Sequence, residues 1–264
     1  MQDKMIRILQ RFHQYNAQHM ASLVFGFDEE TVYDALVIAP TYTPYKLKME
    51  ELGCVTLLRE GSCNAAYLIE ANGMKIAWVK TGTTDANVID HLALCAELQF
   101  KKLIFVGAVG ALKADFLLGD LCTPSYSIDS GYALTYLKES IRDHVPFEKI
   151  YPDRKFVDRV IALCAEKGDT LKPATVFCTP SVALEYTHLD EIRSFDTDLI
   201  EMETAAFYTM SALLEVPAIA LLVVSDNSAS GTALIGRTEE EEARYDHGRK
   251  VILPRVILRT AAMD

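Results

Sequence analysis

The chain has 264 residues, a formal net charge of −11 at pH 7 and 50% hydrophobic residues. This acidity argues against a nucleic-acid-binding surface, because proteins that bind the phosphate backbone are usually basic. The hydrophobic content suffices for a core, yet no apolar run is long enough to cross a bilayer, and the charged start MQDKMIRILQ does not resemble a signal peptide. We therefore expect a cytoplasmic protein with no nucleic-acid or membrane partner.

No stretch rich in Pro, Gly or Ser divides the chain, and no internal repeat appears. We expect a helix and a loop over residues 1–30, followed by one large domain over residues 31–264. The cysteines lack the C-x-x-C spacing of a zinc site, so we expect reduced thiols in the core and no bound metal. These cysteines are Cys54, Cys63, Cys95, Cys122, Cys164 and Cys178.

In chain order, apolar runs bounded by turn residues predict strands, and runs with apolar residues three or four positions apart predict helices. The segment 126–136 has no clear pattern and is a candidate flap. The predicted strands cover residues 34–39, 74–79, 103–106, 119–128, 174–178, 199–200 and 218–224. The predicted helices cover residues 85–98, 152–167, 183–194, 204–215 and 239–260.

Two of the predicted strands end in turns that suit a ligand. The strand over residues 74–79 is followed by Lys80-Thr81-Gly82-Thr83-Thr84 and a helix, an arrangement in which free amides and hydroxyls converge on an anion. The strand over residues 103–106 leads into Gly107-Ala108-Val109-Gly110. These glycines either let backbone lie against a ligand or simply form a tight turn.

The segment 198–230 carries the strongest signal for function. Glu201, Glu203 and Asp226 follow two predicted strands, and open α/β sheets bind their ligands beyond the carboxyl ends of the strands. Each acid alone has a simpler interpretation, since Glu203 suits the positive end of a helix and Asp226 suits a cap. Three carboxylates on one edge of the sheet together predict a site.

The sequence E-M-E before a helix of small residues, and the apolar strand that ends in V-V-S-D, resemble the superfamily of purine nucleoside phosphorylases, uridine phosphorylases and related nucleosidases. The resemblance implies a single α/β domain with three α/β/α layers around a mixed, partly barrel-like sheet, and makes residues 31–264 the catalytic domain. It also implies a homo-oligomer, a dimer or a hexamer built of dimers, because such enzymes bury site residues at subunit interfaces.

By this resemblance Glu203 holds the ribose hydroxyls, Met202 packs on the sugar, and Ser225 and Asp226 address a ring nitrogen of a purine. Glu201 belongs to the same substrate-binding turn. The chemistry agrees, because a carboxylate can accept from both hydroxyls of a vicinal diol, and a purine leaves readily when N7 is protonated. An acid in that role needs a raised pKa, which burial provides.

Other positions take roles from the resemblance alone. The backbone of Gly107, Ala108, Val109 and Gly110 lies beside base and sugar, while Val182, with Phe177, packs on the base. Gly82, Thr83 and Thr84 match a phosphate or sugar loop. Arg59 resembles an arginine that contacts the phosphate bound by the neighbouring subunit. Lys46, in PTYTPYK, supplies a positive charge for phosphate. His13 or His19 either reaches a neighbouring site or is simply solvated.

The expected activity is cleavage of the N-ribosidic bond of a purine nucleoside, with a lean towards phosphorolysis to free base and ribose 1-phosphate. No cofactor is expected, and inorganic phosphate is the possible co-substrate. Phe105 stands where phosphorylases have an arginine that binds phosphate. The segment PTYTPYK stands where they have a glycine-aspartate-proline loop. A hydrolytic nucleosidase acting on a nucleoside or AMP is therefore an alternative, although PTYTPYK also lacks the glutamate of nucleosidases. A non-catalytic nucleoside sensor is a second alternative.

Overall fold

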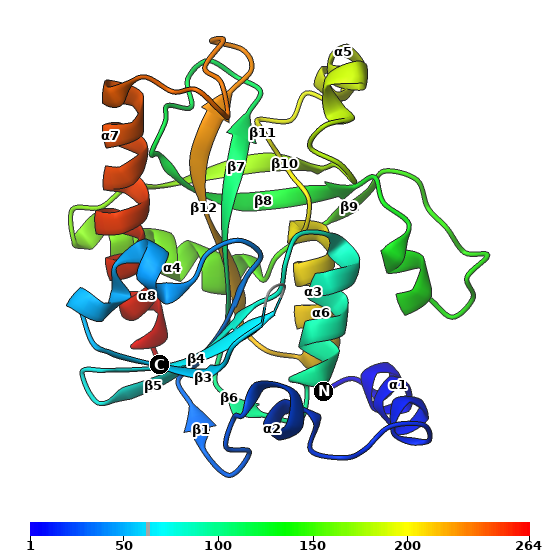
Figure 1. Ribbon diagram of the computed structural model, residues 1–264. Coiled ribbons are helices and arrows are strands. Elements are labelled where there is room, and N and C mark those ends of the chain that lie inside the picture. Colours follow the sequence, from blue (N-terminus) through cyan, green and yellow to red (C-terminus); the bar gives the residue numbers. More distant parts are fainter. Residues whose placement is uncertain (62–63) are drawn as a thin grey trace.

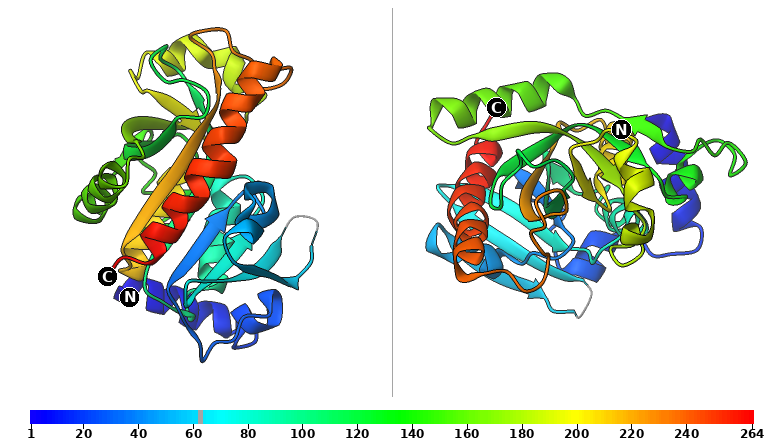
Figure 2. Two further views of the ribbon diagram at one scale, coloured as in Figure 1. Left: turned by 90° about the vertical axis from the view of Figure 1, so that its left-hand side faces the viewer. Right: turned by 90° about the horizontal axis from the view of Figure 1, so that it is seen from above.

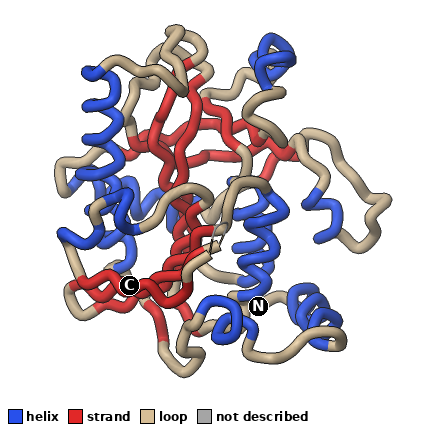
Figure 3. The backbone as a smooth tube through the Cα atoms, in the orientation of Figure 1, coloured by secondary structure: helices blue, strands red, loops and turns tan. Residues whose placement is uncertain are grey.

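The computed structural model describes residues 1–61 and 64–264, so Cys63 lies outside the described residues. Strands at the centre are covered by helices on both sides (Figures 1 and 3). The main sheet has the order β11-β10-β8-β12-β7-β2-β5-β4-β3, with β9 on β8. Its strands are β2 Ala35–Ala39, β3 Cys54–Arg59, β4 Ala65–Ala71, β5 Met74–Lys80, β7 Leu103–Ala111, β8 Leu121–Asp129, β9 Glu148–Ile150, β10 Leu171–Cys178, β11 Leu199–Glu201 and β12 Ala218–Asn227, and β1 Val32–Tyr33 pairs separately with β6 Gln99–Phe100.

One half of the sheet closes on itself. Besides its parallel pairing with β10, β11 pairs antiparallel with β7, where Ile200 lies opposite Gly110. Because β10 pairs with β8, β8 with β12 and β12 with β7, these five strands form a ring. The prediction of a mixed, partly barrel-like sheet is thus confirmed.

The helices form the two outer layers. They are α1 Asp3–His13, α2 Met20–Phe25, α3 Asp85–Leu94, α4 Arg154–Glu166, α5 Leu189–Arg193, α6 Thr204–Leu214, α7 Glu239–His247 and α8 Leu253–Ala261. Helices α3 and α6 lie on one side of the central strands, and α4 and α8 on the other, with α7 and α8 running along β12 (Figures 1 and 2).

Alternate residues of the central strands serve the two layers. Leu36 and Ile38 of β2 point into the core beneath α3 and α6, whereas Val37 belongs to the core beneath α4 and α8. Neighbouring side chains of a strand point to opposite faces, so a strand covered on both sides must be apolar throughout. Residues 35–39 are all buried, which confirms the predicted three-layer arrangement.

Two predicted strand ends were wrong. β7 continues through the G-A-V-G sequence to Ala111, because β11 and β12 supply hydrogen-bond partners on both of its sides. β12 likewise extends past the predicted end at residue 224 and includes Ser225, Asp226 and Asn227; its register shifts between Val224 and Asp226. Such an irregularity redirects side chains while the strand continues.

Two predicted helices were also wrong in extent. The segment 183–194 forms a 3-10 turn, Glu185–His188, followed by the short α5, and its buried side chains are few. Without a continuous apolar face, a longer helix has nothing to pack against the sheet. The predicted helix over 239–260 is α7 and α8 joined by a π turn at Gly248–Ile252, where the backbone of Gly119 lies directly against Gly248.

Within the described ranges, no helix combines the length and apolar character needed to cross a lipid bilayer. The described cysteines are all free. Cys95, Cys122, Cys164 and Cys178 are buried as expected, whereas Cys54 lies exposed on the edge strand β3, which corrects its assignment to the core.

Candidate active site

The predicted acidic edge of the sheet encloses a cavity of about 200 Å³. Its walls come from segments that follow or end the strands β2, β5, β7, β10, β11 and β12. The lining residues include Pro40, Thr41, Thr83, Gly107, Ala108, Val109, Gly110, Thr179, Val182, Glu185, Ile200, Glu201, Met202, Glu203, Ser225, Asp226 and Leu234.

Glu201 holds the turn between β11 and α6. Its carboxylate accepts hydrogen bonds from the backbone amides of Glu203, at 2.8 Å, and Thr204, and from the Thr204 hydroxyl at 2.8 Å. The thiol of Cys178 donates to the same group. A carboxylate at a helix N-terminus satisfies amides that have no partner within the helix. Glu201 thus serves chiefly to position its neighbours, although it lines the cavity.

Glu203 is buried and faces the cavity. Its Oε1 accepts a hydrogen bond of 2.8 Å from the backbone amide of Thr84. Burial and the nearby charge of Glu201 raise the pKa of Glu203 above its usual value. A carboxylate so placed gains stabilisation when a ligand brings hydroxyl donors to it.

The backbone at Thr84 is strained to make this contact. Thr84 has a φ of 100°, a region that β-branched residues rarely adopt. Such strain persists where surrounding structure holds it, and it clusters at functional sites. Because the Thr84 amide is committed to Glu203, the predicted anion loop supports the carboxylate, and of its three predicted members only Thr83 lines the cavity.

Asp226 lines the same cavity. Burial raises the pKa of Asp226, and the hydroxyl of Ser225, which donates to Oδ1 at 2.7 Å, partly offsets that rise. Gly110 makes room for the carboxylate, since an added Cβ would lie 3.0 Å from Oδ2. The G-A-V-G segment is therefore backbone against which Asp226 packs.

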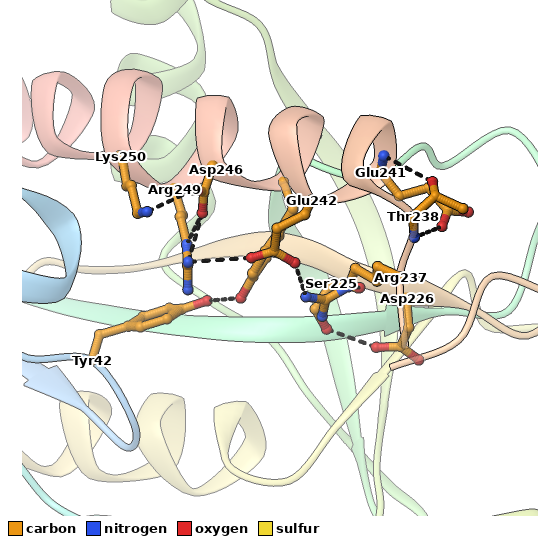
Figure 4. Close-up of polar contacts among 11 residues, drawn as sticks. Tyr42, Ser225, Asp226, Arg237, Thr238, Glu241, Glu242, Asp246, Arg249 and Lys250 are labelled. Atoms are coloured by element: carbon orange, nitrogen blue, oxygen red, sulfur yellow. Dashed lines mark hydrogen bonds and ion pairs between the residues drawn. The ribbon is translucent and has the colours of Figure 1, made fainter. Parts of the chain in front are cut away.

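Arg237, which the sequence did not identify, contacts the backbone of the residue before Asp226. Its Nε donates to the backbone oxygen of Ser225 and its Nη1 to Glu242, both at 2.8 Å (Figure 4). The guanidinium also lies over the ring of Tyr245 and lowers the pKa of Asp226 through its charge. No motif marks Arg237, because it follows Asp226 in a loop without periodic pattern.

Glu185 was also missed, and it adds a fourth carboxyl to the cavity. Its side chain is 8% exposed and forms no hydrogen bond or ion pair with the described residues. Burial, with the charge of Asp226, raises the pKa of Glu185 to about 7. In the sequence this glutamate is one of two in the segment 183–194, which is predicted as an ordinary helix.

Replacing Glu185 by glutamine is expected to raise the melting temperature at pH 8 and to leave it nearly unchanged at pH 5. An acid whose pKa is higher in the folded state binds its proton more tightly there, so stability falls as pH rises from about 4.5 to about 7. Glutamine does not ionise, so the variant does not lose this stability at high pH. We expect a gain on the order of 2–4 °C at pH 8, the effect of about 1 kcal/mol after discounting for residual hydration. Calorimetry at both pH values tests it, and equal gains at both would contradict it.

The remaining predicted contacts divide into two groups. Met202, Ser225 and Val182 line the cavity as expected. Phe177 does not; it packs with Phe147 and Phe195 around an adjoining apolar cavity of about 430 Å³. The two cavities share Thr179 and Glu185, which form part of the wall between them.

The predicted basic residues lie away from the cavity lining. Lys46 donates to the backbone oxygen of Thr41, and Arg59 donates to that of Leu23. Phe105 is buried in the core against Phe207. Of the described residues that line the cavity, none is Lys, Arg or His.

The two N-terminal histidines are engaged within the chain. His13 contacts Glu97 at 3.1 Å, and His19 contacts Glu29 at 2.5 Å. The Glu29 carboxylate raises the pKa of the exposed His19. Neither histidine lines the cavity described above.

Comparison with known proteins gives relatives in sequence and in structure. Purine nucleoside phosphorylase DeoD-type from Alkaliphilus metalliredigens is 31% identical over 151 residues, which are 56% of this chain and 60% of the relative. A purine nucleoside phosphorylase from Toxoplasma gondii, solved with immucillin-H, superimposes with a TM-score of 0.71 at 13% identity over 89% of this chain and 93% of that one. AMP nucleosidase from Bacteroides thetaiotaomicron gives a TM-score of 0.65 at 21% identity over 97% of both chains.

The match to the first of these relatives spans about 60% of its length, and the two structures at these identities establish the fold alone. The family model described as Phosphorylase superfamily matches residues 38–252, which contain both the E-M-E turn and the S-D pair. That match extends over most of the chain, so the protein belongs to the phosphorylase superfamily.

Proposed function

We propose that this protein cleaves the N-ribosidic bond of a purine nucleoside. The observation that carries the proposal is that Glu203 and Asp226, both buried, line one cavity, where burial raises the pKa of Asp226 and so favours the protonated acid. One carboxyl suits a diol and the other suits a leaving base. The purine phosphorylase and nucleosidase relatives support the same reaction class.

In the proposed reaction Glu203 accepts hydrogen bonds from the 2′- and 3′-hydroxyls of the ribose, while Thr84 fixes the carboxylate. Neutral Asp226 gives its proton to N7 of the base as the C1′–N9 bond breaks. The bonding electrons go to the purine, the sugar gains oxocarbenium character, and the acceptor oxygen then bonds to C1′. The positive charge of Arg237 stabilises the Asp226 carboxylate that remains.

The favoured acceptor is inorganic phosphate, with Arg59 of a second copy as its partner. The cavity of one chain lacks a cation among its described lining residues, so a phosphate dianion needs charge from outside. Arg59 is exposed at the end of the edge strand β3, next to the exposed Leu23 and Leu57. An apolar surface around an edge strand suits a homo-oligomer, either a dimer or a hexamer of dimers.

Hydrolysis is the second candidate, favoured by that same lack of basic side chains in the cavity lining. Water needs no anion site, and AMP nucleosidase is among the structural neighbours. For either reaction we place the protein in the cytoplasm. The free thiols of Cys95, Cys122, Cys164 and Cys178 suit a reducing compartment.

The test is release of purine from inosine and adenosine with and without inorganic phosphate, followed by analysis of the sugar. We expect ribose 1-phosphate, and we expect Arg59→Ala to raise the KM for phosphate by roughly 10–100-fold, the loss of about 1.5–3 kcal/mol from one charged hydrogen bond. Arg154→Ala, at an exposed ion pair on α4, is the matched control and should change nothing.

Free ribose formed at the same rate without phosphate would reject phosphorolysis and support the hydrolase. No base release from any purine nucleoside, with binding retained, would instead reject the enzyme and favour a sensor. Sedimentation of wild type and Arg59→Ala checks that the oligomer is intact. A monomer at assay concentration would exclude a shared phosphate site.

A further inference from the structure

Glu185 is a buried acid that the reaction above does not use. It begins the 3-10 turn Glu185–His188, which follows β10 through a loop. Glu185 lines the cavity and also the apolar cavity around Phe147 and Phe177, so it forms part of the wall between them. Leaving a buried polar group without a partner is costly, so a group that lacks one inside the protein is suited to a partner on a ligand.

Glu185 shares the part of the cavity that holds Asp226. The charges of these two acids interact, and both act on the nearby phenol of Tyr186. The cavity measures about 200 Å³, which leaves little room between its walls. A base that meets Asp226 with one ring nitrogen therefore presents the adjoining edge to Glu185.

On a purine, the neighbour of N7 along that edge is the substituent at position 6. A 6-aminopurine offers a hydrogen-bond donor there, and a 6-oxopurine offers an acceptor. We propose that Glu185 is a specificity-determining residue that accepts a hydrogen bond from the 6-amino group, so that adenosine-type nucleosides are preferred over inosine-type nucleosides. This rests on the proposed cleavage of purine nucleosides, with Asp226 at N7.

The physical basis is the asymmetry of an ionised carboxylate, which accepts hydrogen bonds and cannot donate them. Facing a 6-oxo group, it places two acceptors against each other in a buried site, and such mismatches discriminate more strongly than differences in apolar contact. Protonated Glu185 would donate to a 6-oxo group instead. The preference for the 6-amino substrate should therefore increase as pH rises through about 7.

Other titratable groups lie near Glu185 and do not account for this pH dependence. Glu201 keeps its four donors, and Glu203, which lines the same cavity, is the proposed ribose ligand. His188 and Glu191 pair with each other on the far side of the wall, in the second cavity. The remaining titratable groups are Asp226 and Tyr186. Both are present whichever substrate is bound, so their titration changes the two rates alike and cancels in the ratio of kcat/KM values.

The experiment measures kcat/KM for adenosine and for inosine from pH 6 to pH 8.5. For wild type we expect the ratio of adenosine to inosine to rise with pH and to exceed about tenfold at pH 8. In Glu185→Gln the amide can accept or donate, so the ratio should approach one and lose its pH dependence. Glu185→Leu, which offers neither, should also lose the preference. The control Glu191→Gln, outside this cavity, should keep the wild-type ratio.

A merely structural role for Glu185 would lower both rates together and leave the ratio unchanged, which would overturn the inference. A wild-type preference for inosine at pH 8 would overturn it as well. If wild type released no base from either nucleoside, the proposed function itself would have failed. If both were cleaved with a ratio indifferent to Glu185, only the inference would have failed.

Discussion

Replacing Glu203 by glutamine is expected to lower kcat/KM for a purine ribonucleoside by about 10³-fold. A charged hydrogen bond contributes roughly 1.5–3 kcal/mol, and the carboxylate makes two of them to the ribose in the proposed complex. The amide can still accept from the Thr84 backbone, so the turn that holds it stays in place. Steady-state kinetics with inosine and adenosine measure the loss.

The melting temperature should not fall in Glu203→Gln. Burial raises the pKa of Glu203, so the ionised group costs stability above the unfolded pKa, and removing it removes that cost. Glu215→Gln, at an exposed glutamate that ends the same helix α6, is the matched control. Activity within a fewfold of wild type in Glu203→Gln would show that the ribose is held elsewhere.

A second substrate separates the sugar contact from general damage. A 2′-deoxynucleoside lacks one of the two hydroxyls, so wild type should discriminate against it, and Glu203→Gln should discriminate much less. Coupling of this kind between a side chain and a substrate group reports their direct contact. Equal discrimination in both proteins would place the 2′-hydroxyl away from Glu203.

Replacing Asp226 by asparagine is expected to lower kcat/KM for unmodified purine nucleosides by about 10²–10⁴-fold, the usual range for a positioned general acid. The amide keeps the size of the side chain and still accepts from the Ser225 hydroxyl, so the packing against Gly110 is preserved. What it lacks is the proton for N7. Rapid base-release assays with inosine and adenosine test the prediction.

Nucleosides methylated at N7 carry a positive charge on the base before the bond breaks, so they need no acid. For 7-methylinosine, Asp226→Asn should retain activity within about threefold of wild type. Asp196→Asn, at an exposed aspartate before β11, is the matched control and should behave as wild type with every substrate. An equal loss with methylated and unmethylated nucleosides would show that Asp226 binds the base without protonating it.

The sequence by itself determined the family, the layered fold and three of the acids that line the cavity. Those features are local in the sequence. A strand covered on both faces, such as β12, is apolar along most of its length. The E-M-E and S-D motifs follow such strands in the sequence. Glu203 and Asp226 come together because β11 and β12 both pair with β7, where Ile200 and Asp226 lie opposite Gly110.

The tertiary structure decided everything that depends on partners distant in the chain. The contact between Thr84 and Glu203 joins residues 119 positions apart, and β11 closes the ring of strands by pairing with β7. The same holds for the place of Phe177 outside the cavity and of Glu185 inside it. A pattern of apolar and polar residues shows which side chains are buried, but the pKa of a buried acid and its contacts depend on neighbours that only the folded chain brings together.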